Sequence, residues 1–406
     1  MASKRGSSSR SGELFDGRVY GTPAVPSRRG RPARRGQRAT DPSEIAGTAI
    51  VDREEISRPA IVSDLDLPFE RTAPVPVPTP PEDPRRTFEL VGGVHLTGTV
   101  LWFDCEHRAD LTFLSHAHAD FAGKNRRILA TDKTLRILTR KSGRIEALTS
   151  PYKHPFTLGP LTIEMHPAGH VLGSAQLLVE KDGRRIVYTS DVSTRPSATV
   201  ERGKPVECDV LVIPATYGSP IYRFPPRSEV VESIRAFVTR CFEEQATPVL
   251  LAEQIGISQE LIRVLGDAGI KLRVHGSIYE IAKIYREFGV VLPNSRRFQG
   301  TPARDEVVIF PPILKKHAAI RKLKKSKTAF VTGRAVEPGF AAKNRIDAAF
   351  ALDNAPDHAE LLEIIDATGA NEIYLSGGFV EELGSQLRQK GKKVYSLVQA
   401  EQLKLF

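Results

Sequence analysis

Three side chains able to ligate a metal ion, His116, His118 and Asp120, occupy alternate positions in the stretch L-T-F-L-S-H-A-H-A-D-F-A-G. Alanines separate them, and such small residues let a short loop curl so that the three polar groups converge on one point. Two imidazoles and a carboxylate suit Zn²⁺ or a similar divalent ion. Taken alone, each residue is equally well explained as a hydrogen-bonded polar side chain at a strand end.

Two later stretches supply further ligands. His170 lies in the glycine-containing loop H-P-A-G-H-V-L-G-S-A-Q, and Asp191 follows the strand R-I-V-Y-T-S. Three imidazoles and one carboxylate form a sufficient ligand set for a single Zn²⁺. The alternatives are a loop hydrogen bond for His170 and a turn cap for Asp191.

Apolar patterns place these residues at the ends of short strands. Strands are predicted at 88–91, 94–104, 111–114 and 161–165, with a hairpin around Lys181-Asp182-Gly183 and a buried strand at 210–214. Residues 132–142 predict a basic helix.

The pattern changes from about residue 218 to 340. Helices predicted at 229–244, 258–268 and 277–288 alternate with strands at 248–252, 272–275, 306–310 and 329–332, which indicates an α/β unit with a parallel sheet. Helices at 359–367 and 380–390 flank a strand at 372–375. We therefore expect a second domain inserted into the first.

The positive net charge suggests a polyanionic binding partner. The 406 residues carry a formal net charge of +10, and residues 1–50 hold ten Lys and Arg against four Asp and Glu. Residues 1–85 predict a disordered, basic and Pro-rich tail that ends in a polyproline-like spacer. Within it, Arg29-Gly30-Arg31-Pro32 resembles an AT-hook for the minor groove of A·T-rich DNA. A non-specific phosphate-binding arm and a plain solubilising tail are the alternatives.

The same composition indicates the compartment. Three scattered cysteines argue against a disulfide framework and against a thiolate zinc site. No apolar run reaches the roughly 20 residues of a membrane span, and the Arg-rich N-terminus is unlike a secretory signal. These features predict a cytoplasmic protein without a membrane partner.

Four motifs in order resemble the β-CASP group of metallo-β-lactamase-fold hydrolases. They are S-H-A-H-A-D-F-A-G, H-P-A-G-H-V-L-G-S-A-Q, Y-T-S-D-V and C-D-V-L-V-I-P-A-T-Y-G-S-P-I-Y-R-F-P-P. The likeness covers about residues 87–406 and is strongest to bacterial DNA-ligase-associated exonucleases and mRNA 3′-end-processing-factor-like proteins. It implies a four-layer αββα fold of the α/β class, built from residues 86–217 and 341–406, with a β-CASP domain inserted at 218–340.

The resemblance also implies roles for individual residues. His116, His118, His170 and Asp191 would bind the first metal. Asp120 would hold a second metal or orient the attacking water, so Asp120 and Asp191 are the expected catalytic residues. A family histidine further on aligns with Ala355 without gaps, or with His358 after a shift of three residues. His358 is otherwise an exposed residue in the first turn of a helix.

Three departures from the family pattern fall on the second metal. The last histidine of the first motif is replaced by Phe121, a buttressing acid by Pro214, and a C-terminal histidine by Gly377. The expected site therefore holds one Zn²⁺ per chain, with a second site in doubt. Two interpretations follow. The protein is either a one-metal nuclease, or a protein that keeps the fold and binds nucleic acid but no longer catalyses its hydrolysis.

Several residues are expected to bind nucleic acid. Residues 315–327 hold seven Lys and Arg and no acid, and on a helix they would form a basic face. The expected contacts are Arg29, Arg31, Lys315, Lys316, Arg321, Lys322, Lys324 and Lys325, with Tyr222 and Arg223 beside unpaired bases.

The sequence thus predicts a zinc-dependent phosphodiesterase, exonucleolytic on DNA ends or RNA, in which a metal-bound hydroxide attacks phosphorus. The alternative is an inactive nucleic-acid-binding accessory protein of DNA repair or RNA processing. A lactone or thioester hydrolase is less favoured, because a small substrate needs neither the insertion nor the basic segment. The resemblance further implies a DNA ligase or helicase as partner.

Overall fold

The computed structural model describes residues 87–90, 93–118, 125, 127–142 and 145–397. The basic tail with Arg29 and Arg31, the Pro-rich spacer, Asp120 and Phe121 lie outside these residues. The described strands form three sheets, called A, B and C here.

Sheets A and B are formed by the two ends of the described chain, with the inserted unit between them in sequence. Sheet A contains, in spatial order, β1 (Phe88–Leu90), β2 (Val94–Leu96), β3 (Leu101–Phe103), β4 (Leu111–Phe113), β5 (Ile128–Ala130) and β6 (Ala147–Thr149). Sheet B contains β19 (Lys393–Ser396), β18 (Glu372–Gly378), β11 (Val210–Ala215), β10 (Arg184–Tyr188), β9 (Ala175–Lys181), β8 (Leu161–Pro167) and β7 (Phe156–Leu158). Because β18 pairs with β11, the C-terminal segment completes the sheet that the earlier segment began.

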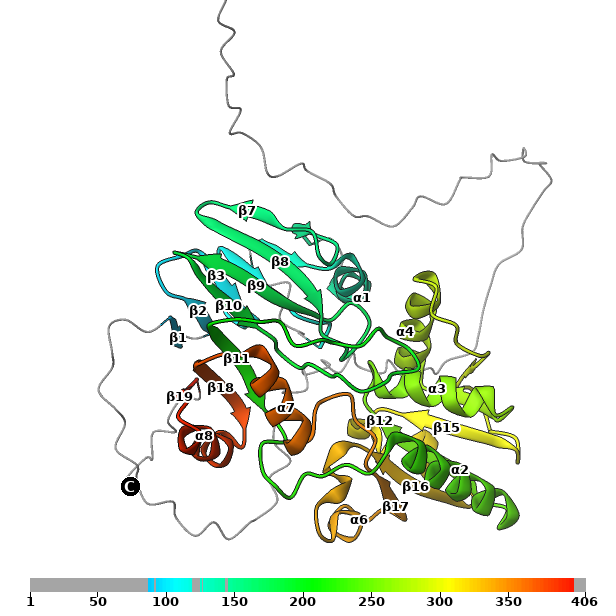
Figure 1. Ribbon diagram of the computed structural model, residues 1–406. Coiled ribbons are helices and arrows are strands. Elements are labelled where there is room, and N and C mark those ends of the chain that lie inside the picture. The colour runs from blue at the N-terminus through cyan, green and yellow to red at the C-terminus, as the bar shows by residue number, and fades with distance from the viewer. Residues whose placement is uncertain (1–86, 91–92, 119–124, 126, 143–144, 398–406) are drawn as a thin grey trace, which may run out of the picture. The chain divides into compact units, whose positions relative to one another are not determined.

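One apolar core fills the space between sheets A and B. Phe103 and Phe113 of sheet A pack in it with Tyr188 and Val212 of sheet B. Alternate residues of β11 face the other way, where Leu211 meets α7 (His358–Thr368) and α8 (Val380–Gln389). Figure 1 shows these two helices beside β11 and β18. The period-2 alternation of strand residues explains how one strand serves two cores.

Helix α1 (Asp132–Ser142) covers the other face of sheet A. Ile128 and Ala130 of β5 pack with Ile137 and Leu138 of α1, while the intervening Leu129 faces sheet B. A mixed α/β protein with several sheets is therefore confirmed for the described residues.

Sheet C is an all-parallel sheet in the inserted unit. Its spatial order is β14 (Arg296–Arg297), β13 (Lys271–Val274), β15 (Glu306–Phe310), β12 (Thr247–Ala252), β16 (Ser326–Val331) and β17 (Ala348–Phe350). Three longer helices pack on one face: α2 (Arg227–Glu243), α3 (Ile257–Asp267) and α4 (Gly276–Glu287). The other face carries α5 (Ala318–Arg321) and α6 (Phe340–Lys343), and two 3-10 turns occupy Pro312–Leu314 and Gly333–Val336.

Two expectations about this unit are wrong. Strand β17 pairs with β16, so the unit continues to Phe350 rather than ending at residue 340. Residues 315–327 form no single helix, because only Ala318–Arg321 is α-helical and β16 already begins at Ser326. The prediction failed because charge density alone carries no helical periodicity of apolar residues.

The three cysteines, Cys105, Cys208 and Cys241, are buried and form no disulfide. In the described part of the chain, no helix combines the length and the apolar character that crossing a bilayer requires.

Candidate metal centre

Three histidines from distant segments meet at one point. One ring nitrogen from each of His116, His118 and His170 lies within 4.8 Å of the other two. The Asp191 carboxylate is the fourth group, with Oδ2 3.8 Å from His116 Nε2 and 3.9 Å from His170 Nε2. Tetrahedral zinc with bonds of about 2.0–2.1 Å separates its ligand atoms by about 3.4 Å. The observed spacing therefore fits one small cation.

Each imidazole presents a lone pair to this point because its other nitrogen faces an oxygen. His118 Nε2 lies 3.3 Å from the carbonyl of Ile255, and His170 Nδ1 lies 3.1 Å from the carbonyl of Asn354. A carbonyl only accepts, so the nitrogen beside it carries the proton in the neutral ring. The inner nitrogens, His118 Nδ1 and His170 Nε2, are then two acceptors 3.2 Å apart. Two facing lone pairs at that separation repel each other, and a cation held between them would remove this repulsion.

His116 is oriented by a buried carboxylate acting through a serine. Ser115 Oγ donates to Asp104 Oδ2 at 2.6 Å and lies 2.8 Å from His116 Nδ1, from which it accepts. Asp104 also accepts from the Ser115 amide at 2.9 Å and from the Tyr188 hydroxyl at 3.0 Å. Burial raises the pKa of Asp104, and these donors oppose that rise. The relay fixes His116 with Nε2 toward the cluster, in the manner of partners that orient metal ligands.

Protonation of this cluster is disfavoured. Burial, together with the neighbouring His118 and His170, lowers the pKa of His116 well below its usual value. Neutral imidazoles are the form that binds metal. Sequence reasoning did not find Asp104, since its carboxylate is brought to Ser115 only by the pairing of β3 with β4.

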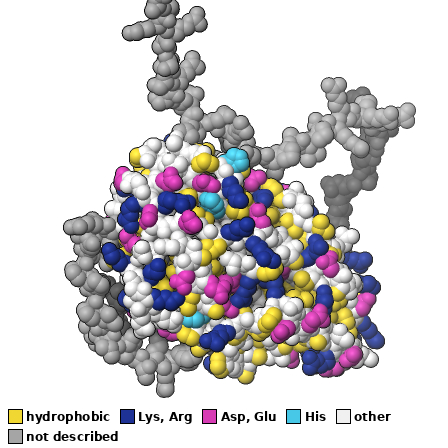
Figure 2. All heavy atoms as spheres, in the orientation of Figure 1, with side chains coloured by type: hydrophobic (Ala, Val, Ile, Leu, Met, Phe, Trp, Pro, Cys, Tyr) yellow, Lys and Arg dark blue, Asp and Glu magenta, His cyan; other side chains and the backbone are white. Residues whose placement is uncertain are grey.

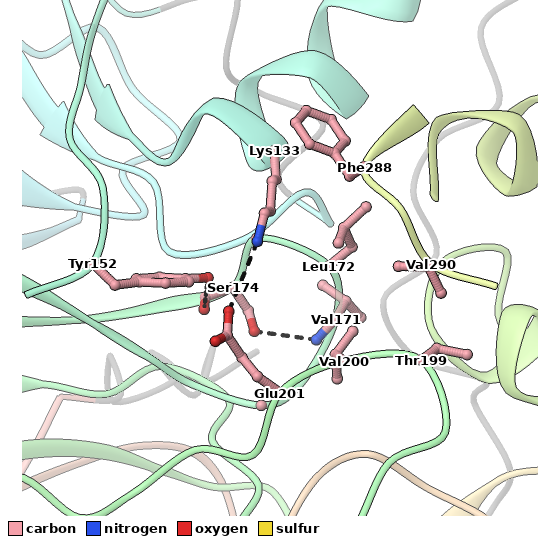
Figure 3. Close-up of a pocket in the computed structure, with 12 residues that line it drawn as sticks. Lys133, Tyr152, Val171, Leu172, Ser174, Thr199, Val200, Glu201, Phe288 and Val290 are labelled. Atoms are coloured by element: carbon pink, nitrogen blue, oxygen red, sulfur yellow. Dashed lines mark hydrogen bonds and ion pairs between the residues drawn. The ribbon is translucent and has the colours of Figure 1, made fainter. Parts of the chain in front are cut away.

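The loop that carries His170 is packed against three neighbouring segments. Gly169 has φ +79°, and a Cβ there would lie 2.3 Å from the Ser193 carbonyl oxygen. Only glycine tolerates both the conformation and the close approach. Ser174 Oγ accepts from the His170 amide at 3.1 Å, and Tyr152 donates to the Ser174 carbonyl at 2.9 Å. Tyr152 and Ser174 line a cavity of about 210 Å³. Figure 3 shows them there with Lys133 and Glu201, whose charged groups lie 3.8 Å apart.

The inserted unit contributes the turn between β12 and α3. Its Ile255 carbonyl faces His118, and the next residue, Gly256, has φ +91°. A Cβ at Gly256 would lie 2.7 Å from Val171 in the His170 loop. The turn therefore touches two of the three histidine segments.

Acidic side chains surround the cluster on the side of this turn. The Glu253 side chain has exposed surface, although much protein lies around its carboxyl group. Loss of hydration raises the pKa of Glu253 to about 7. Asp353 and Asp191 add to this rise, and His170 opposes it. Asp353 accepts from the Tyr217 hydroxyl at 2.7 Å and from the Gly333 amide at 2.8 Å. Asp191 follows Ser190, whose φ of +50° is uncommon for a non-glycine residue.

A buried carboxylate, Glu260, links the inserted unit to the segment after Asp191. Glu260 of α3 is fully buried and lies 2.7 Å from Arg227 Nη2, while Ser197 and Thr199 donate their hydroxyls to it. Burial alone would raise the pKa of Glu260, but these partners outweigh it and the pKa is lowered. Arg227 also donates to the carbonyl of Asp353 at 3.2 Å.

His358 is held away from the three-histidine cluster of the described residues. Its Nδ1 lies 2.8 Å from the Gly218 carbonyl, and the residue is buried at the start of α7 rather than exposed there. Its role as a distal ligand stays a prediction. Ala355, the ungapped equivalent of the family histidine, is buried between Tyr217 and Tyr222.

The expectation that Tyr222 stacks on bases is wrong. Its ring packs against Tyr217 and Phe379, its hydroxyl donates to Glu337 at 2.9 Å, and only 4% of its surface is exposed. Arg223 is exposed, and its contact with unpaired bases stays a prediction. We call Tyr217, Tyr222, Phe224, Phe379 and Ala355 the aromatic cluster.

The carboxyl ends of the parallel strands form one edge of sheet C, and their amino ends form the opposite edge. The expected phosphate-binding lysines lie at both. Lys315 and Lys316 follow β15 and therefore lie at the carboxyl ends of the strands, the edge from which the Ile255 turn emerges. Lys325 precedes β16 at the other edge and donates to the Glu244 carbonyl at 2.6 Å. Arg321, Lys322 and Lys324 lie between them and are exposed. On the face in Figure 2, Lys and Arg are interspersed with Asp and Glu.

Comparison with known proteins finds distant relatives. The chain is 29% identical over 319 residues to a probable DNA ligase of Opitutus terrae, covering 77% of this chain but 31% of that protein. It is 25% identical to an RNase J-like protein of Methanocaldococcus jannaschii, covering 44% of this chain and 50% of the relative. It is 32% identical to the endoribonuclease YSH1 of Gibberella zeae, covering 30% of this chain and 15% of the relative.

The chain thus spans half or less of these relatives. No protein-family profile matches it. Among solved structures, a protein of unknown function from Enterococcus faecalis aligns with a TM-score of 0.47 and 14% identity, over 65% of this chain and 74% of that one.

Proposed function

Because the chain belongs to the β-CASP group of the metallo-β-lactamase-fold nucleases, we propose that it is a metal-dependent phosphodiesterase with one cation per chain. The stacked sheets A and B with outer helices support the four-layer αββα arrangement, and sheet C supports the inserted β-CASP domain. The proposed substrate is a nucleic-acid end, cleaved exonucleolytically.

The convergence of three imidazole lone pairs carries the proposal. His116 Nε2, His118 Nδ1 and His170 Nε2 are aimed at one point by separate acceptors on their outer nitrogens, and Asp191 completes the set. Four nitrogen and oxygen donors at this spacing suit Zn²⁺. A cation held there would lower the pKa of a water ligand and neutralise charge on phosphoryl oxygens.

Carboxylates beside the histidines would handle the protons of the hydrolysis. Hydrolysis adds a water oxygen to phosphorus and breaks the bond to the leaving oxygen, which takes up a proton. Asp191 is the carboxylate beside the histidines in a position to accept a proton from the attacking water. Asp120 shares this assignment by family resemblance. Glu253 is close enough to Asp191 and to Asp353 for both carboxylates to raise its pKa.

Residues without ligating groups at the family's second-metal positions support a single cation rather than two. Ala355 has no ligating group and is enclosed by Tyr217 and Tyr222. Pro214 and Gly377 lie at the ends of the paired strands β11 and β18, where the family has an acid and a histidine. Together with Phe121, these replacements remove donors from the second site while keeping those of the first.

The same replacements favour a second candidate function, an inactive accessory protein that grips nucleic acid through its basic segments. A DNA ligase is the proposed partner in either case. The relative named a probable DNA ligase carries the matching stretch as 31% of its own chain. The tail with Arg29 and Arg31 would add sequence-independent contact with phosphates or an AT-hook in the minor groove.

One preparation tests both candidates. The full chain is analysed for metal and then assayed with Zn²⁺ or Mn²⁺ on single- and double-stranded DNA and RNA. We expect one zinc per chain and cleavage from an end, both lost in His116→Ala/His118→Ala. Metal content without cleavage of any substrate would support the accessory protein, and metal-free protein would contradict both the site and the enzyme. Removing residues 1–85 tests the tail, since DNA affinity and its salt dependence should fall.

A further inference from the structure

We infer that a strand of nucleic acid is anchored by a basic edge patch on the inserted unit, formed by His275, Arg297, Lys316 and His317. The patch is distinct from the lysine-rich run as a whole. This inference rests on the proposed function and specifies which cations of the inserted unit meet the substrate backbone.

Contacts between the rings and the guanidinium hold the patch together. The rings of His275 and His317 are 6.4 Å apart and both lie against Phe310, at 5.1 and 5.8 Å. Arg297 lies over Gly276, where a Cβ would be 3.0 Å from its Nε. Glycine at this position therefore lets the guanidinium rest against the backbone beside His275.

The cations of the patch differ from several other cations of sheet C, which are paired with carboxylates, as Arg334 is with Glu337. At the amino ends of the strands, Lys271 pairs with Asp305 at 2.6 Å and Lys327 with Glu244 at 2.5 Å. At the carboxyl ends, Arg297 and Lys316 are exposed and, among the described residues, have no carboxylate partner. Unpaired cations are the ones free to replace the counterions of a phosphate backbone.

The patch also lies on the edge that reaches the metal centre. In the sheet order β13, β15, β12, the end of β13 at His275 is two strands from the end of β12. Strands spaced about 4.8 Å apart place it about 10 Å along this edge. The turn after β12 then contacts His118 through Ile255. A chain whose end lies at the histidines would therefore run along this edge, with later phosphates at Arg297 and Lys316.

The test measures binding separately from cleavage. A fluorescent single-stranded DNA and an RNA of the same sequence are titrated with the full chain in EDTA, by anisotropy, at several salt concentrations. Loss of one single-strand phosphate contact lowers the salt slope by about 0.7, which is about fivefold in affinity at 0.1 M salt. We expect this from Arg297→Ala and from Lys316→Ala, and about 25-fold weaker binding from both together.

Lys271→Ala is the matched control, because it removes the same charge from the amino ends of the strands, where Lys271 is paired with Asp305. It should bind like the wild type, and all variants should keep the wild-type melting temperature. Edge-patch variants that bind as tightly as Lys271→Ala would overturn the inference, whereas cleavage assays with Zn²⁺ would still report on the proposed function. Wild-type protein that cleaves but shows no salt-dependent binding would overturn the patch and leave the enzyme standing.

Discussion

Replacing Ser115 by alanine should weaken metal binding without removing a ligand. The hydroxyl of Ser115 connects His116 Nδ1 to Asp104, at 2.8 and 2.6 Å. Without it, His116 keeps its place in the chain but loses the acceptor that fixes its tautomer and ring orientation. Loss of such a partner typically costs 10–100-fold in metal affinity. We therefore expect zinc to bind Ser115→Ala about 10–100-fold more weakly, equivalent to about 1.4–2.8 kcal/mol.

Tyr188→Phe is the control for this prediction. Its hydroxyl donates to the same carboxylate, Asp104 Oδ2, at 3.0 Å, but lies off the path to His116. Each substitution removes one hydrogen bond to a buried carboxylate, so each should lower the free energy of unfolding of the metal-free protein by about 1.5–3 kcal/mol. Only Ser115→Ala should lower the affinity for zinc.

The assay is competition for zinc against a chromophoric chelator, with urea unfolding in EDTA as the stability measurement. The reasoning fails if Ser115→Ala binds zinc as tightly as the wild type. It also fails if Tyr188→Phe weakens zinc binding to the same extent, because the effect would then follow stability rather than the orientation of His116.

Three further changes test the surroundings of the centre. Gly256→Ala combines a left-handed φ with a Cβ 2.7 Å from Val171. The free energy of unfolding of this variant should therefore fall by about 1–3 kcal/mol, and its affinity for zinc should fall as well. Wild-type values for both would contradict the close approach. Glu260→Gln leaves the partly buried Arg227 guanidinium without its carboxylate partner. Urea unfolding should therefore show a loss of up to about 3 kcal/mol, and a loss within error would show the pair to be dispensable. In EDTA, the raised pKa of Glu253 should make the wild type lose stability relative to Glu253→Gln as pH rises from about 4.5 to 7, because the unfolded chain releases that proton at lower pH. Solvent screening of an exposed carboxyl reduces the size of this difference; melting temperatures of the two proteins that change in parallel across these pH values would refute the shift.

Local pattern was enough to locate the elements and three of the histidines. The runs around 248–252 and 306–310 became β12 and β15, and the helices expected near 258–268 and 277–288 became α3 and α4. Such periodicities depend only on residues close together in sequence, so they can be recognised from the sequence alone. His116, His118 and His170 were recognised from residue type and spacing, and the fold brings them together.

Only the tertiary structure decided which groups support those histidines. Asp104, the Ile255 carbonyl and the Asn354 carbonyl reach the cluster from other strands and from another unit of the fold. A backbone carbonyl carries no residue-type signal, so no reading of the sequence could have selected it. The same holds for charge: the run 315–327 looks uniform, but chain direction in a parallel sheet separates Lys316 from Lys325 and gives each a different neighbour. Long-range packing therefore determined how each ring is oriented and which cations stay free, whereas the sequence determined what could bind.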